Sequence, residues 1–241
     1  MKKIFKKKNA VETIVCYVIS LTILITSSVD AVGGGIYYNK CILKINSSAE
    51  YLYYSFAKKE SDMLKFSRYN SIDTVELNEN TSVFFIGLDD EYNVVEPLHK
   101  EDYTIIKIEP VELDFVFDYG RDSAVASPNF FVVDLGSDYA KSPYLKFDKT
   151  GSTLMVCCPE GTKKLLYDYK FSNTNVADFG AFTVEVSDDG TNFEILNFFS
   201  EMKTTTAADS FILSENTKFI KFTYSLKNKG NIALGNIRIF H

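Results

Sequence analysis

Large apolar and polar side chains alternate along most of the chain, and the 3.6-residue spacing of a helix is rare. The clearest alternating segments are residues 111–117, 165–171, 182–186 and 220–226. A period of two places apolar side chains on one face of a strand, as a half-buried antiparallel sheet requires. Turns that contain glycine separate these segments. The pattern predicts an all-β protein, with one or two turns of helix near Ala57–Leu64 as the single exception.

The first residues are patterned differently and predict an export signal over residues 1–31. Five lysines precede an apolar stretch from about Thr13 to Ile25, and the small residues Val29 and Ala31 follow it. A basic start, a short apolar run and a small-residue exit describe a secretory signal peptide. The alternative is a retained signal-anchor, but the run is shorter than the roughly 20 apolar residues of a spanning helix, which favours cleavage. We expect a secreted or cell-surface protein with no membrane insertion after signal cleavage.

Composition and charge exclude several functions. The chain has 20 Phe and 15 Tyr but no Trp, which suits strands. Removal of residues 1–31 takes away five lysines and two carboxylates, and so lowers the net charge of −6 by three units. An acidic chain without a basic cluster repels phosphate backbones and anionic membranes. Nucleic acid is therefore not an expected partner.

The strands are expected to form two domains on either side of Glu109–Pro110. Proline cannot donate to a β-ladder and restricts the preceding residue to extended geometry, which suits a linker. The predicted organisation is a signal peptide at 1–31, a β-sandwich at 36–108 and a second β-sandwich at 111–241. Gly33–Gly35 is expected to be a flexible exit from the signal.

The second domain resembles a known family in three ordered pieces. A hairpin signature runs from Phe182 to Leu196 around Ser187-Asp188-Asp189-Gly190, and the segments Ser142–Met155 and Lys218–Phe240 flank it. This order resembles galactose-binding-like jelly rolls, the discoidin and carbohydrate-binding-module type of domain found in secreted bacterial enzymes. The resemblance implies a jelly-roll fold and a non-catalytic role in binding. Relatives usually carry Asp where this chain has Gly235.

The last strand contains a change of phase. Ile232 and Leu234 share one parity, whereas Ile237 and Ile239 share the other. One extra residue at Gly235-Asn236 would let all four side chains face the same side. We therefore predict a β-bulge at this position.

The first domain resembles bacterial immunoglobulin-like spacers of the chitobiase C-terminal type. Short strands are expected in the ranges 41–45, 51–56, 73–77, 81–88 and 103–108, and the segment Asp89–Asn93 is expected to form a hairpin tip. The chain departs from the usual Asp-Gly turn at Ala57–Glu60. Such modules space or orient their neighbours, and the resemblance implies no chemistry here.

The cysteines, His99 and the acidic pairs are interpreted as structural residues. Cys41, Cys157 and Cys158 remain after signal cleavage, and without a Cys-x-x-Cys spacing they are interpreted as buried thiols. A disulfide from Cys41 to one of the pair is the alternative. His99 is placed in a loop, and the acidic pairs Asp89-Asp90 and Asp188-Asp189 are interpreted as turn residues rather than catalytic carboxylates. No enzyme activity is predicted.

Two kinds of ligand site stay open. The acidic loop Asp118–Asp122 supplies Asp118 and Asp122 as candidate oxygen ligands for a structural calcium ion, the one candidate cofactor. Asp134 and Asp138 are the candidate helpers from outside this loop. Loop aromatics with polar neighbours form a candidate ligand-binding set: Tyr119, Arg121, Asn129, Tyr139 and Tyr144.

These observations predict a non-catalytic binding module. Its expected partner is a carbohydrate or a cell-surface protein, recognised through the C-terminal jelly roll. The alternatives are a structural or protein-interaction component of the cell envelope, and an accessory subunit of a secreted depolymerase.

Overall fold

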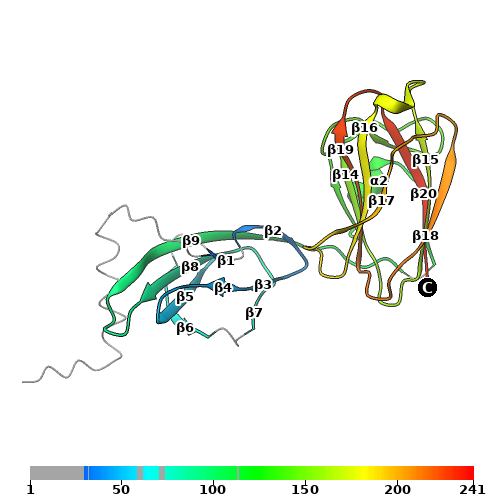
Figure 1. Ribbon diagram of the computed structural model, residues 1–241. Helices are drawn as coiled ribbons and strands as arrows, with labels where there is room; N and C mark the ends of the chain where they lie inside the picture. The colour runs from blue at the N-terminus through cyan, green and yellow to red at the C-terminus, as the bar shows by residue number, and fades with distance from the viewer. Residues whose placement is uncertain (1–29, 32, 59–61, 71–73, 113) are drawn as a thin grey trace, which may run out of the picture. The chain divides into compact units, whose positions relative to one another are not determined.

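The computed structural model describes residues 30–31, 33–58, 62–70, 74–112 and 114–241. The chain divides into two compact units, unit 1 up to Ile106 and unit 2 from Lys107 to His241, and each unit has its own sheets and its own hydrophobic core. Nearly all regular structure is strand, which confirms the all-β prediction (Figure 1). In the described part of the chain no helix has the length and apolar character needed to cross a bilayer.

The predicted signal peptide lies outside the described residues except at its end. Asp30 and Ala31 form a two-residue strand, β1, that pairs with Ile45–Asn46. Gly35, which was expected to belong to a flexible exit, instead begins a strand that pairs in parallel with Tyr103–Ile106. The expectation of a flexible Gly33–Gly35 is therefore wrong at Gly35, because its backbone is held by a neighbouring strand.

Unit 1 is built on one five-stranded sheet and two short two-stranded pairings. Its strands are β1 (Asp30–Ala31), β2 (Gly35–Tyr38), β3 (Cys41–Leu43), β4 (Ile45–Asn46), β5 (Tyr51–Ala57), β6 (Ser67–Tyr69), β7 (Val75–Leu77), β8 (Thr81–Leu88) and β9 (Val94–Ile106). The large sheet has the order β2-β9-β8-β5-β6, while β3 pairs with β7 and β1 with β4. A small core that includes Leu43, Phe85 and Tyr103 joins β3 to the large sheet.

Unit 2 is an antiparallel β-sandwich. Its elements are β10 (Phe115–Phe117), α2 (Arg121–Ala126), β11 (Phe130–Val133), β12 (Leu135–Gly136), β13 (Leu145–Phe147), β14 (Thr153–Cys157), β15 (Lys164–Phe171), η1 (Val176–Asp178), β16 (Gly180–Ser187), β17 (Glu194–Phe198), β18 (Ala207–Ile212), β19 (Phe219–Lys227) and β20 (Ile232–Phe240). One sheet has the order β12-β13-β20-β15-β18, with β10 also on β20, and the other has the order β11-β14-β19-β16-β17. The two layers face each other in Figure 1.

The alternating side chains of unit 2 fill the space between the two sheets. On β15 the inward residues Leu165, Tyr167, Tyr169 and Phe171 are all buried, as the sequence pattern predicts. Phe182 on the opposite sheet packs edge-on against Phe147, with 5.2 Å between ring centroids. Tilted and edge-to-face rings of this kind suit aromatic packing and fill the core without a tryptophan.

The predicted bulge in the last strand is present. Between β15 and β20 the pairing shifts from Leu166↔Arg238 to Asp168↔Gly235, so β20 contains one extra residue. Asn236 takes the left-handed backbone conformation at this point, with φ of 46°. As a result Ile232, Leu234, Ile237 and Ile239 all face the core despite their change of parity.

Four local expectations are corrected. Ala57 ends β5, and the described residues 58 and 62–64 are not helical, whereas a helix that the pattern missed spans Arg121–Ala126. His99 lies within the long strand β9 and not in a loop. The strand expected from Val111 is shorter, since β10 begins at Phe115. Leu226, expected to face the core, is 53% exposed because the inward row of β19 ends at Tyr224.

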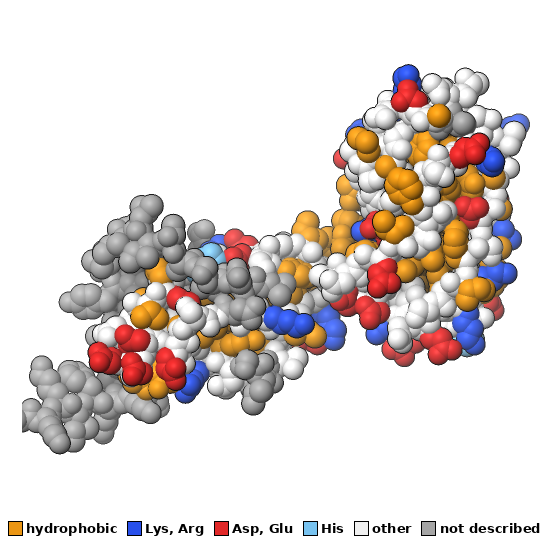
Figure 2. All heavy atoms as spheres, viewed as in Figure 1, with side chains coloured by type: hydrophobic (Ala, Val, Ile, Leu, Met, Phe, Trp, Pro, Cys, Tyr) orange, Lys and Arg blue, Asp and Glu red, His pale blue; other side chains and the backbone are white. Residues whose placement is uncertain are grey.

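One side of the sandwich carries exposed hydrophobic residues. The two sheets end there in the edge strands β17 and β18. Phe198 and Ile195 on β17 and Ile212 on β18 are each more than half exposed. Figure 2 shows hydrophobic side chains on the face of unit 2 in view, where Figure 1 places these two strands.

Candidate functional site

A cleft of about 760 Å³ lies in unit 2 against the outer face of the sheet that contains β20. Ala233 forms part of its wall and lies between Ile232 and Leu234, which both point into the core, so Ala233 points outward. The remaining wall comes from the loop after β12, the end of β15 with the loop that follows it, and the segment before β18. Four separate stretches of chain therefore meet at one end of one sheet.

The lining of this cleft is rich in hydroxyl and amide groups, which come from Ser142, Ser172, Asn173, Thr174, Thr204 and Thr206. Backbone hydrogen bonds hold the loops that carry them. The N–H of Phe171 donates to the carbonyl of Lys203 at 2.7 Å, and the N–H of Ser172 donates to the carbonyl of Asn231 at 2.9 Å. Neutral groups that both donate and accept hydrogen bonds thus face the cleft from a fixed backbone.

Tyr139 is the aromatic residue of this cleft that the sequence analysis nominated. Its backbone N–H donates to the carbonyl of Tyr144 at 2.9 Å, which closes the loop across Ser142 and Pro143. The Lys146 ammonium lies 6.0 Å from the centre of the Tyr139 ring. The Tyr139 hydroxyl is buried and has no hydrogen-bond partner. A buried hydroxyl without a partner is costly, and most such groups in proteins are satisfied.

Asp118 ties the cleft loop to the bulged strand. Its Oδ1 accepts hydrogen bonds from the Ser142 hydroxyl at 2.7 Å and from the backbone N–H of Asn236 at 3.0 Å. The Asn236 side-chain amide donates in turn to Asp168 Oδ2 at 2.9 Å. The bulge therefore presents a backbone donor to a carboxylate that also fixes a residue of the cleft wall.

The other nominated binding residues lie outside the described cleft lining. Tyr119 is 62% exposed and packs edge-on against Phe117. The Arg121 guanidinium hydrogen-bonds to Asp122, its neighbour in the chain. The side-chain amide of Asn129 donates to the carbonyls of Glu109 and Pro110, and thereby holds the start of unit 2. The backbone carbonyl of Tyr144 accepts the hydrogen bond from the N–H of Tyr139.

The nominated calcium ligands are engaged in separate contacts. Asp118 binds Ser142 and Asn236, and Asp122 pairs with Arg121. Asp134 Oδ1 lies 3.6 Å from the Lys149 ammonium. Across the ranges that the structure describes, no group of three or more His, Cys, Asp or Glu side chains is arranged to hold a metal ion.

The acidic pairs singled out as turn residues contain one capping aspartate each. Asp89 Oδ1 accepts from the backbone N–H groups of Glu91 and Asn93, and hydrogen bonding by Asn93 lowers the pKa of Asp89. Asp189 Oδ1 accepts from the backbone N–H groups of Thr191 and Asn192. Both carboxylates stabilise their hairpin turns in the way such residues usually do. The side chains of Cys41, Cys157 and Cys158 are buried, and none of these three cysteines forms a disulfide.

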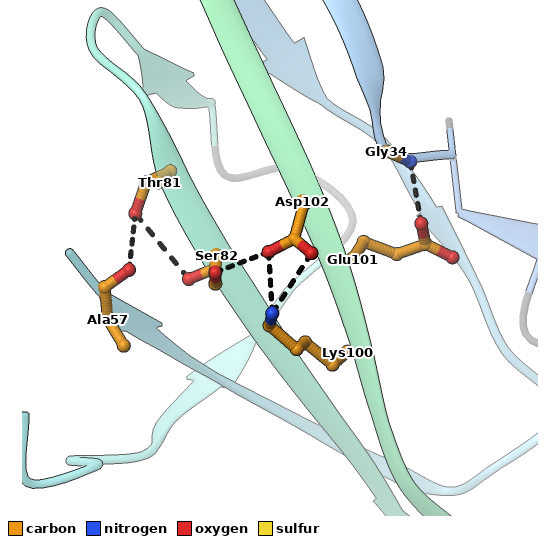
Figure 3. A network of polar contacts seen from close by, with 7 residues as sticks. All are labelled: Gly34, Ala57, Thr81, Ser82, Lys100, Glu101 and Asp102. Atoms are coloured by element: carbon orange, nitrogen blue, oxygen red, sulfur yellow. Dashed lines mark hydrogen bonds and ion pairs between the residues drawn. The ribbon is translucent and has the colours of Figure 1, made fainter. Parts of the chain in front are cut away.

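A second polar cluster lies on the large sheet of unit 1 (Figure 3). The hydroxyl of Ser82 and the ammonium of Lys100 both hydrogen-bond to the Asp102 carboxylate, and these bonds lower the pKa of Asp102. Glu101 points to the other side of β9 and accepts from the N–H of Gly34 at 2.8 Å. A hydrogen bond from His99 lowers the pKa of Glu101. Each charge here has a partner within the sheet.

Most residues of the cleft were missed by the sequence analysis. Ser172–Thr174 and Thr204–Thr206 are polar runs between predicted strands, which is a signal for loops. That signal does not say which loops meet. Their meeting depends on β15 lying between β18 and β20, which is a feature of the sheet order.

No protein-family model matches the chain, and no curated protein sequence matches it either. Among solved structures, the K3 adhesin domain of Lys-gingipain from Porphyromonas gingivalis is 15% identical, with 53% of this chain and 97% of that chain covered and a TM-score of 0.42. A family 29 carbohydrate-binding module is 10% identical over 54% of this chain and 92% of its own, with a TM-score of 0.38.

A third neighbour is the tandem CBM22 domain of Xyn10C from Paenibacillus barcinonensis. It is 9% identical over 85% of this chain and 79% of its own, with a TM-score of 0.36. At such low identities and TM-scores these likenesses carry no argument about a ligand. A function for this protein therefore has to be inferred from its own residues.

Proposed function

We propose that this protein is a non-catalytic binding module of the cell exterior, and that unit 2 recognises carbohydrate in the cleft beside Tyr139. Unit 1 serves in this proposal as a spacer without chemistry of its own. The supposed export rests on the basic and apolar pattern of residues 1–31.

The observation that carries the proposal is the chemistry of the cleft wall. Six residues with hydroxyl or amide side chains line a space of about 760 Å³, which is a suitable size for a small ligand. Sugars present several hydroxyl groups that need both donors and acceptors, and Ser, Thr and Asn supply both. The wall thus matches a polyhydroxylated ligand better than an apolar one.

Tyr139 supports the proposal through its ring. Its ring lies beside the hydroxyl-rich wall and offers an apolar surface for the C–H face of a sugar. Its hydroxyl is buried and has no partner, so the ring is the part of Tyr139 that a ligand in the cleft can contact.

A hydrolytic reaction in the cleft lacks support. A glycosidase needs a pair of carboxylates, and a nucleophilic triad needs an imidazole. None of the described residues in the lining is an Asp, Glu, His or Cys. Binding without chemistry is the simplest role for such a wall.

The test is a glycan-binding assay on the purified protein with two matched tyrosine variants. Tyr139→Ala should weaken binding of any captured glycan about tenfold or more, because it removes the ring beside the wall. Tyr119→Ala is the control, since Tyr119 is exposed but lies outside the described lining. Thermal unfolding of both variants checks that they fold.

Tyr139→Phe separates the ring from the hydroxyl. This variant should weaken glycan binding by a smaller factor than Tyr139→Ala, while the free protein becomes no less stable because a buried unpaired group is removed. The proposal fails if no glycan is retained at high protein concentration, or if folded Tyr139→Ala binds as well as the unchanged protein.

A further inference from the structure

The cleft differs from the rest of this acidic chain in the sign of its charge. The net charge of the chain is −6. The described lining residues nevertheless include two lysines, Lys141 and Lys170, and no carboxylate. The two ammonium groups favour an anion at this lining, although the chain as a whole is acidic and the Asp118 carboxylate bonds to Ser142 of the wall.

Neither lysine is neutralised by a partner in the described structure. Other lysines of unit 2 form ion pairs, such as Lys221 with Glu185 at 3.1 Å and Lys146 with Asp148 at 3.5 Å. No carboxylate among the described residues lies within ion-pair distance of Lys141 or Lys170. An ammonium group carries three donors, so both remain available to a ligand.

Lys170 is paired across the sheet with Ala233, which forms part of the cleft wall. The small residue Ala233 on β20 is paired with Lys170 on β15 and with Lys146 on β13. Directly opposed side chains in an antiparallel pair lie about 5 Å apart, so the methyl group of Ala233 is flanked by a lysine on each side. Since Lys146 is engaged with Asp148 and lies near the Tyr139 ring, Lys170 is the flanking cation that a ligand can pair with.

Unpaired lysines alone do not define a site, and unit 2 contains others. Lys164 lies on the same strand as Lys170, is exposed, and has no ion pair in the described structure, but it is outside the described lining. What distinguishes Lys141 and Lys170 is their place in a cleft that is lined by hydroxyl and amide residues and by Tyr139.

We infer that the ligand of this cleft is an anionic saccharide, whose carboxylate or sulfate group is held by Lys170 and Lys141 while the Ser, Thr and Asn side chains bind its hydroxyls. The inference rests on the proposed function and names the class of glycan that it recognises. Charge-assisted hydrogen bonds from an ammonium to an anionic oxygen are roughly twice as strong as neutral ones. They supply the discrimination against neutral sugars that hydroxyl groups alone do not give.

The test is calorimetric titration of the full chain with three probes of matched length. These are an oligogalacturonate, a sulfated galactose oligomer and the neutral galactose oligomer. One or both anionic probes should bind about tenfold more tightly than the neutral one, and added salt should reduce this difference. The two anionic probes distinguish a carboxylate from a sulfate as the recognised group.

Lysine variants locate the effect. Lys170→Gln and Lys141→Gln should each raise the Kd for the anionic probe severalfold and leave the Kd for the neutral probe nearly unchanged. Lys170→Glu should abolish the preference altogether. Lys164→Gln removes the same charge from the same strand outside the cleft and should leave all three Kd values unchanged.

The outcomes separate the two proposals. Equal binding of neutral and anionic probes, or a Lys164→Gln effect as large as that of Lys170→Gln, overturns the anionic inference and leaves carbohydrate binding intact. Failure of all three probes to bind, together with no glycan captured in the wider assay, overturns both.

Discussion

The large sheet of unit 1 and the β20-containing sheet of unit 2 differ in whether their charged side chains have partners. On unit 1 the charged residues of β9 have partners within the sheet. For example, Ser82 and Lys100 both donate hydrogen bonds to the Asp102 carboxylate. On unit 2 the lining of the cleft beside β20 includes Lys170, which has no ion pair among the described residues. In the proposed function, the strand lysine without an ion pair takes part in binding, whereas a charge that is neutralised within its own sheet does not.

The interiors of the units differ as well. The core of unit 2 is an extended set of interlocking aromatic rings between two sheets, whereas that of unit 1 is smaller and lies mainly on one sheet. One fully buried ring in each unit allows the two cores to be compared directly.

Truncation of one core ring in each unit should have the largest effect. Phe182 in unit 2 and Phe85 in unit 1 are both fully buried. Phe182→Ala and Phe85→Ala should each lower the free energy of unfolding by about 3–5 kcal/mol through lost burial and a cavity. Urea unfolding followed by circular dichroism measures this. A loss well below 1 kcal/mol for Phe182→Ala would contradict the central place of that ring.

Substitution of Asn236, in the β-bulge of unit 2, should have the next largest effect on the free energy of unfolding. Asn236→Val places a β-branched residue at a φ of 46° and removes the hydrogen bond to Asp168. We expect a loss of about 1–3 kcal/mol in the free energy of unfolding. Asn236→Gly is the control, because glycine accepts this backbone conformation and should lose only about 1 kcal/mol with the side-chain bond. Equal losses in both variants would show that backbone strain is not the cause.

Acid should act in opposite directions on two carboxylates, Glu101 in unit 1 and Asp209 in unit 2. A hydrogen bond from His99 lowers the pKa of Glu101 in unit 1, so the stabilisation from this carboxylate is present above its unfolded pKa of about 4.3 and is lost as the pH falls towards the folded value. Burial raises the pKa of Asp209 in unit 2. Folded unit 2 therefore binds this proton more tightly than the unfolded chain, and Asp209 opposes folding increasingly as the pH rises above about 3.9.

Two isosteric variants separate these contributions. Glu101→Gln should reduce the loss of stability on acidification, and Asp209→Asn should remove a cost that is present at neutral pH. The free energy of unfolding measured between roughly pH 3 and 7 tests both signs. Parallel profiles for the variants and the unchanged protein would show that neither group is linked to folding.

The smallest effect is expected at the exposed edge of unit 2. Ile212 is 77% exposed on the edge strand β18. Ile212→Ser should change the free energy of unfolding by no more than about 0.5 kcal/mol, because little buried area is lost. A larger loss in the isolated protein would mean that this edge is covered by a contact in solution, and sedimentation analysis of the variant would then show a change in mass.

Much of unit 2 could be predicted from the sequence because its strands repeat one physical pattern. The inward positions of β15, and even the bulge at Asn236, follow from the parity of apolar residues along a strand. The helix Arg121–Ala126 was missed because so short an element carries too few periodic positions. The strand position of His99 was missed because this part of β9 is mostly polar, contains Pro97 and shows no clear apolar alternation. Tyr139 was nominated as a loop aromatic, whereas Lys170 and Thr204–Thr206 were not connected with it.

Alternation along the chain by itself determined that this protein is made of half-buried strands and which side chains would leave water, since burial depends on each strand's own pattern. The sheet order of unit 2 decided the rest. It brought the loop at Tyr139 beside the end of β15 and the segment before β18. Contacts between residues so far apart in sequence depend on which strands pair with each other, and the local pattern of apolar residues does not specify that pairing.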